Sequence, residues 1–143
     1  MNLRVRRLID ATPEEVWALL VRWERQAEWM PDVAWVRVVG AGREAGAIVE
    51  VRTKVFGVPA TTDRLEVTAW EPPRRLVVRH TGLVSGSGEW LLEPVGERTG
   101  FTWTERLRLP PPVLGEAALL VYAPVQTAML RRSARNLARL VGG

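Results

Sequence analysis

The spacing of hydrophobic and polar residues changes twice along the chain, and each change marks a different kind of element. Residues 2 to 9 alternate hydrophobic and polar side chains, a pattern typical of a half-buried strand. Thr12, Pro13 and Glu15 follow as a helix start, with a hydroxyl N-cap, a proline in the first turn and a capping-box glutamate. We therefore predict a helix from Pro13 and a second short helix through Ala27, with Pro31 closing the segment.

From Val33 to Leu109 the hydrophobic period is two, which predicts strands with one buried and one solvated face. Glycine and proline clusters interrupt the pattern five times and divide it into six strands. These breaks fall at residues 40–46, 57–59, 72–73, 82–86 and 95–100. Because the connections are short, we predict an antiparallel meander.

Residues 113–141 contain one glycine, Gly115, and predict a single long helix interrupted at Pro124. Helical spacing places a first apolar stripe before the proline and another, rotated stripe after it. The first stripe comprises Leu114, Ala118, Val121, Val125 and Met129, and the second comprises Leu130, Ser133, Leu137 and Val141. A kink near Pro124 would reconcile the two stripes.

These elements predict an α+β fold of the helix-grip type. One strand, two short helices, six strands and a long helix follow one another along the chain. Seven curved antiparallel strands need a cover for their apolar face, and the C-terminal helix is the only predicted element long enough. The sheet is therefore expected to wrap around that helix, within one domain over residues 1–143.

Several segments together resemble the START-like superfamily, in its polyketide cyclase/dehydrase and lipid-transport branch. They are IDATPEEVWALL, EWMPDVAWVRVVG, EPPRRLVVRH, GSGEWLLEP, RTGFTWTERLRLP and RRSARNLARL, in this order along nearly the whole chain. The resemblance implies a cavity between the sheet and the C-terminal helix that holds a lipid, a polyketide or another apolar molecule. It implies catalysis in some members and none in others, so it leaves open whether this chain is an enzyme.

Composition narrows the other possibilities. The chain has no cysteine, which excludes disulfides and thiol catalysis, and with one histidine we expect neither a metal site nor a cofactor. Charges near the N-terminus and the absence of an apolar run of about 20 residues predict a cytoplasmic protein without integral membrane association. The net charge of +4 is ordinary for a small domain.

Three polar residues share the phase of the buried strand faces, namely Asp63, His80 and Glu105. Burial of such groups costs free energy unless they find partners or line a wet cavity. One hypothesis makes them general acids or bases, or groups that orient a ligand. The alternative places Asp63 and His80 at strand ends with their tips in solvent and pairs Glu105 with an arginine. Glu105 is the strongest of the three because it lies in mid-strand.

Trp90 and Trp103 fall on adjacent strands with inward phase and would form an aromatic wall or a packed core. The full set expected to line a ligand cavity adds strand and helix residues to these polar and aromatic groups. It comprises Val51, Asp63, Val67, His80, Trp90, Trp103, Glu105, Val121, Tyr122, Val125 and Met129.

Three functions fit these observations. The first is binding of an apolar small molecule without turnover, and the second is a cyclase or dehydratase with an acidic residue or His80 as acid or base. The third is a regulatory domain that docks a partner through an exposed tryptophan or through Arg131, Arg132, Arg135 and Arg139, which share one helix face. That arginine stripe could bind anionic lipid or nucleic acid, but it is more typical of the solvated side of a packing helix, so we expect no nucleic-acid partner. A homo-oligomer stays open.

Overall fold

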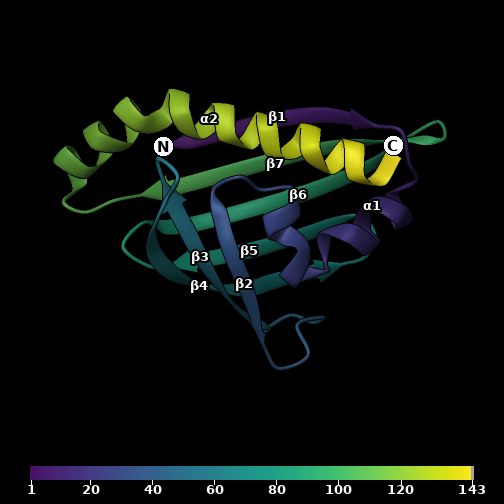
Figure 1. The fold of residues 1–143 in the computed structure, drawn as a ribbon, viewed down its shortest axis with the longest axis horizontal. Helices are drawn as coiled ribbons and strands as arrows, with labels where there is room; N and C mark the ends of the chain where they lie inside the picture. The colour runs from purple at the N-terminus through teal and green to yellow at the C-terminus, as the bar shows by residue number, and fades with distance from the viewer. Residues whose placement is uncertain (143) are drawn as a thin grey trace.

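The computed structural model describes residues 1–142, and the order of its elements confirms the predicted helix-grip fold (Figure 1). The strands are β1 (Asn2–Ile9), β2 (Val33–Val39), β3 (Ile48–Val55), β4 (Val58–Glu71), β5 (Arg75–Thr81), β6 (Ser85–Val95) and β7 (Arg98–Arg108). The helices are α1 (Pro13–Leu20), the 3-10 helix η1 (Trp23–Glu28) and α2 (Pro112–Gly142).

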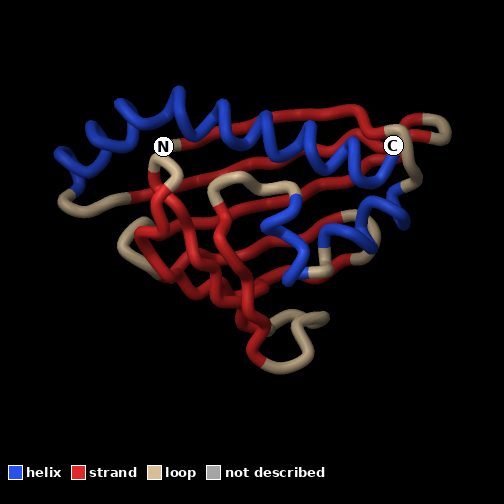
Figure 2. Tube along the Cα trace, viewed as in Figure 1, coloured by secondary structure: helices blue, strands red, loops and turns tan. Residues whose placement is uncertain are grey.

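All seven strands pair antiparallel in one sheet with the order β1-β7-β6-β5-β4-β3-β2. Strands β2 to β7 form the predicted meander, each paired with its neighbour in the chain. Strand β1 instead pairs with β7, so the two edges of the sheet belong to β1 and β2. The segment with α1 and η1 therefore carries the chain from one edge to the other across the inner face (Figures 1 and 2).

The start of α1 has the predicted cap. Thr12 lies in an extended conformation, and its hydroxyl oxygen accepts a hydrogen bond from the backbone N–H of Glu15 at 3.3 Å. The same hydroxyl donates to the Glu15 carboxylate at 3.2 Å, which ties the two residues to each other. Val16 and Leu20 are fully buried, so this short helix packs its apolar face into the core.

Helix α2 continues through Pro124, arches over the sheet, and extends its first turns beyond the strand ends (Figures 1 and 2). One stripe at intervals of three or four residues faces the protein along its whole length. It comprises the buried residues Gly115, Leu119, Leu130, Ser133, Ala134 and Leu137 and the partly buried Tyr122 and Gln126. The predicted second stripe, Leu130 to Val141, is confirmed, whereas the predicted first stripe and its rotation at Pro124 are wrong.

The predicted first stripe, Leu114 to Met129, lies one residue away from the observed one. Leu114 is 72% exposed and Val121 is 82% exposed. The stripe that packs inward contains Gly115 and Gln126 and is therefore less apolar than the stripe left in solvent. Periodicity alone favoured the more apolar side, and tertiary packing selects the other.

Helix α2 is also long and apolar enough to cross a membrane, by length and composition alone. The expectation that no segment qualifies was therefore too strict. One such helix is weak evidence for a membrane span, and the second half of α2 packs against β1 as part of the domain.

Candidate functional site

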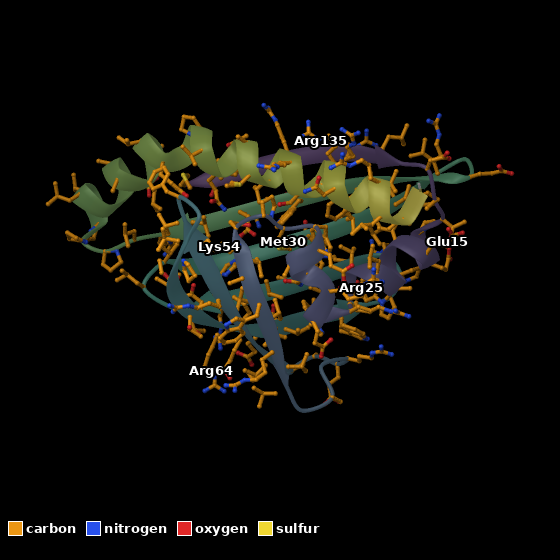
Figure 3. The ribbon with its side chains drawn as sticks, in the orientation of Figure 1. Glu15, Arg25, Met30, Lys54, Arg64 and Arg135 are labelled. Atoms are coloured by element: carbon orange, nitrogen blue, oxygen red, sulfur yellow. The ribbon has the colours of Figure 1, made fainter. Side chains whose placement is uncertain are left out.

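A cavity of about 310 Å³ lies between the inner face of the sheet, the segment around η1, and α2. Strands β3 to β7 supply one wall, and Leu119, Tyr122, Gln126 and Leu130 of α2 supply the opposite one. Figure 3 labels Met30 and Lys54, two further wall residues, beneath α2. Most of the wall is apolar, so the few polar side chains on it determine which chemistry the cavity offers.

Glu105 of β7 is the central polar group, and it is 7% exposed. One carboxylate oxygen, Oε1, accepts a hydrogen bond from Trp103 Nε1 at 2.9 Å. The other, Oε2, lies 3.0 Å from His80 Nε2 of β5. Both carboxylate oxygens are therefore held by neighbours on the same face of the sheet, which fixes the orientation of the carboxylate.

Gly88 of β6 pairs with Glu105 across the ladder and leaves room for its carboxylate. A Cβ at position 88 would lie 3.0 and 3.1 Å from the two Glu105 oxygens. That separation is closer than ordinary van der Waals contact. Glycine at this position therefore lets the buried carboxylate lie flat against the sheet between its two partners.

The charges around His80 shift its pKa in opposing directions. Burial lowers the pKa of His80, but the hydrogen bond to Glu105, the Glu105 charge and the Asp63 charge raise it, and the net pKa is above its ordinary value. The neighbouring carboxylates therefore favour the protonated imidazole of His80 more than water does. The pair can hold a proton at His80 Nε2 or release it to a bound molecule.

Asp32, which follows η1, is a cavity residue that sequence reasoning missed. Burial raises the pKa of its carboxyl, and the negative charge of Glu105 raises the pKa further, against a backbone hydrogen bond that lowers it. The cavity therefore contains carboxyl groups in two different environments. In the sequence, Asp32 lies within the segment EWMPDVAWVRVVG, which carries the family resemblance but shows no periodicity at Asp32.

The structure brings all three candidate polar residues to this one cavity. The alternative with the His80 tip in solvent is wrong, because His80 bonds Glu105 inside the cavity, whereas Asp63 lines the cavity but stays partly exposed. The alternative with Glu105 paired to an arginine is also wrong, since its partners are His80 and Trp103. Asp63 itself accepts a hydrogen bond from Thr61 at 3.3 Å and packs against Gly82.

Trp90 and Trp103 are cross-strand partners, and their rings meet edge to face with centroids 6.0 Å apart. Both line the cavity and both are nearly buried, so they serve as core and wall at once. Trp29 packs behind them, 5.8 Å from Trp90 and 6.0 Å from Trp103. The aromatic wall is therefore backed by a second aromatic layer that holds it rigid.

The remaining predicted cavity residues divide into two groups. Val51 and Tyr122 lie on the wall. Val67 is fully buried in the core beside the cavity, and Val121, Val125 and Met129 lie off the wall because α2 presents its neighbouring stripe. The prediction that these four residues line the cavity is wrong. On α2 the cavity wall is formed instead by Leu119, Gln126 and Leu130, together with Tyr122.

A family model described as polyketide cyclase / dehydrase and lipid transport matches residues 1–142. This chain belongs to that family. Its sequence is 29% identical over 136 residues to the uncharacterized protein Rv2574 of Mycobacterium tuberculosis, covering 90% of this chain and 77% of the relative.

Solved structures share the fold at lower identity. The chain matches TTHA0849 from Thermus thermophilus with a TM-score of 0.80 and 22% identity, over 99% of this chain and 97% of that one. It matches the di-domain ARO/CYC protein StfQ from the steffimycin biosynthetic pathway with a TM-score of 0.78 and 17% identity, over 98% of this chain and 50% of StfQ. It matches norcoclaurine synthase from Thalictrum flavum, solved with dopamine and hydroxybenzaldehyde, with a TM-score of 0.72 and 14% identity. That match covers 99% of this chain and 86% of the synthase.

Proposed function

We propose that this family member binds one compact, largely apolar molecule that lies against Trp90 and Trp103 and directs a polar group toward His80 and Glu105. The observation that carries this proposal is the hydrogen-bonded His80–Glu105 pair within an apolar cavity. Burying a carboxylate and an imidazole costs free energy that an apolar core would avoid. A small number of fixed polar groups in an apolar cavity is the usual arrangement for orienting a small molecule.

The cavity volume supports a compact ligand. About 310 Å³ is near the lower end of the roughly 300 to 1,000 Å³ typical of small-molecule sites. One or a few fused rings, or a single short acyl chain, suit this volume better than a molecule with two long chains. The family description, which pairs polyketide cyclases with lipid transport, fits either kind of ligand.

Tryptophan fluorescence gives a direct test, since Trp23, Trp90 and Trp103 line the cavity. We expect the neutral probe N-phenyl-1-naphthylamine to quench this emission with a stoichiometry of one, and native mass spectrometry of protein from its own host to show a bound metabolite. Leu130→Trp should reduce probe binding by filling the cavity, whereas Leu140→Trp, at an exposed position, should not. Failure of the probe, of the host metabolite and of an apolar compound library to bind would refute the proposal.

A second candidate function is acid–base catalysis, and the His80–Glu105 pair favours it specifically. An oriented histidine with a carboxylate at 3.0 Å can take a proton from a carbon next to a carbonyl and return it elsewhere, as cyclisation and dehydration require. StfQ and norcoclaurine synthase, two structural neighbours, carry enzyme names, which agrees with this candidate without assigning their reactions to this chain.

Proton exchange tests the second candidate without knowledge of the natural substrate. 2-Tetralone, a flat bicyclic ketone, would be incubated with the protein in D₂O and its deuterium content followed by mass spectrometry. We expect protein-dependent exchange that Glu105→Gln and His80→Gln abolish while probe binding persists. Arg43→Gln, at an exposed position off the cavity wall, should leave the exchange unchanged. Exchange equal to that of buffer would leave binding alone as the function.

The cytoplasmic location stays a prediction from the cysteine-free, charged sequence.

A further inference from the structure

Helix α2 leaves an unusually apolar surface in solvent. We define its outer face as the exposed residues within about 100° of arc opposite the buried stripe. These are Val113, Ala117, Leu120, Val121, Pro124, Ala128, Arg131, Arg135 and Arg139. The face is uncharged from Val113 to Ala128 and carries arginine from Arg131 onward, so its character changes once along the helix.

The uncharged half of the outer face is well exposed. Val113 and Val121 are each 82% exposed, and Leu120 is 58% exposed. Only 17% of the most apolar 18-residue stretch of α2 is buried, unlike a helix that fills a core. Glu116 is the one charged residue between Leu109 and Leu130, and the N-terminal amine neutralises it at 3.0 Å.

The arginine half continues into a basic groove between α2 and β1. Arg4, Arg6 and Arg7 of β1 line this groove together with Arg131 and Arg135 of α2, and we call it the arginine groove. None of these five arginines takes part in a salt bridge within residues 1–142. Five guanidinium groups without a salt-bridge partner in the described residues make this groove strongly basic. Such a groove, next to an exposed apolar surface, favours an anionic partner.

The helix segment that carries the apolar half also contributes Leu119, Tyr122 and Gln126 to the cavity wall. Tyr122 lines the cavity, and the ring of Phe56, at the β3–β4 turn, meets it edge to face with centroids 6.1 Å apart. Phe56 is 78% exposed, and Val58 in the same hairpin is 64% exposed. The β3–β4 turn, the β5–β6 loop and the start of α2 lie at one end of the molecule (Figures 1 and 2).

We infer that the outer face of α2 docks on an anionic membrane surface, with its apolar half in the headgroup region and the arginine groove on lipid phosphates. An interfacial helix of this kind combines an apolar side with flanking basic residues. A second copy of the chain fits less well: full-length antiparallel pairing would set each apolar half against arginines, and parallel pairing would set the like-charged arginine halves against each other. Docking here would bring the Phe56–Tyr122 end of the cavity next to the bilayer, a consequence that rests on the proposed ligand-binding function.

Vesicle flotation tests the inference, with extruded vesicles of phosphatidylcholine alone and of phosphatidylcholine with 30 mol% phosphatidylglycerol. We expect the protein to float with the anionic vesicles, to float at least about tenfold less with neutral ones, and to dissociate as salt is raised. Val121→Asp should abolish flotation. Val95→Asp, an exposed valine at the β6–β7 turn, is its matched control and should float like wild type.

Charge reversal supplies the second pair of variants. Arg131→Glu with Arg135→Glu should weaken binding about tenfold or more, whereas Arg43→Glu with Arg64→Glu, which changes the net charge equally, should have little effect. Figure 3 shows Arg135 beside α2 and Arg64 at the opposite side of the molecule. Circular dichroism checks that each variant is folded.

Three results would overturn the inference: no flotation with either vesicle, equal effects of the matched variants, or a dimer that Val121→Asp dissociates. Probe binding to the cavity is measured without vesicles and therefore reports on the proposed function separately. Retained probe binding without flotation would reject membrane docking alone, and lost probe binding with intact flotation would reject only the ligand site.

Discussion

The coupling between His80 and Glu105 gives the sharpest test of the site. Their side chains meet at 3.0 Å, with 21% of His80 and 9% of Glu105 exposed, so water screens the interaction only partly. A hydrogen bond to a charged group is worth about 1.5 to 3 kcal/mol. We therefore expect a double-mutant cycle of His80→Gln and Glu105→Gln to give a coupling energy of about 1 to 3 kcal/mol at pH 5.5, measured from urea unfolding.

The same cycle should lose most of its coupling at high pH. The pKa of His80 is raised in the folded protein, so the stabilisation is complete below the ordinary value near 6.5 and disappears as pH rises through the folded pKa. At pH 9, with the imidazole neutral, the pair should keep no more than about 1 kcal/mol. Asp32 also has a raised pKa, but it is present in all four proteins of the cycle, so its own contribution to the pH dependence cancels.

An exposed ion pair provides the control for this measurement. Arg37 and Glu50 meet at 2.7 Å on the outer surface, where 68% of the arginine side chain is exposed. Their cycle should give below about 1 kcal/mol and the same value at both pH values. A His80–Glu105 coupling under about 0.5 kcal/mol at pH 5.5, or one independent of pH, would refute the argument that the pair holds a proton.

Three further predictions concern stability and use urea unfolding. Trp103→Ala should lower the free energy of unfolding by about 3 to 5 kcal/mol, because Trp103 is 6% exposed. Trp35→Ala, at a position that is 43% exposed, should cost far less. A small loss at Trp103 would mean that the ring borders an open cavity. Thr12→Ala should cost about 0.5 to 2 kcal/mol through the lost cap, and no loss would discount the hydrogen bond to Glu15. Gly86→Ala should cost about 2 kcal/mol or more, since its φ is +134° and a Cβ would lie 1.8 Å from the Arg106 carbonyl oxygen; Gly96→Ala, with a positive φ but open space, should cost less.

Local patterns predicted the elements well because local chemistry determines them. Thr12 and Glu15 form their cap from neighbouring atoms, and the alternation along β3 reflects a strand with one more deeply buried face. The inward phase of Glu105 was visible for the same reason. Strand order within the meander followed from short connections, which leave each strand next to its neighbour.

The composition of the site depended on distances that no local pattern records. His80 and Glu105 are 25 positions apart in the sequence and meet because β5, β6 and β7 are successive strands in register. Asp32 lies outside regular structure, so no periodicity placed its side chain in the cavity. A β-bulge between Val67 and Ala69 further shifts the phase of β4 and brings Trp70 against the core, beyond what alternation predicts.

The misassigned stripe of α2 carries functional information of its own. A helix whose only task is to cover a sheet should bury its most apolar side, as amphipathic helices of soluble domains do. In α2 that side, with Leu114, Val121 and Val125, is exposed, while Gly115 and Gln126 face inward. Inward residues are constrained by the cavity, where Gln126 adds a polar group to the wall, and by close approach, since a Cβ on Gly115 would lie 1.5 Å from the Leu109 carbonyl oxygen. Packing within the domain therefore explains the inner stripe but not the apolar stripe left in solvent. Contact with a membrane would explain the exposed apolar stripe.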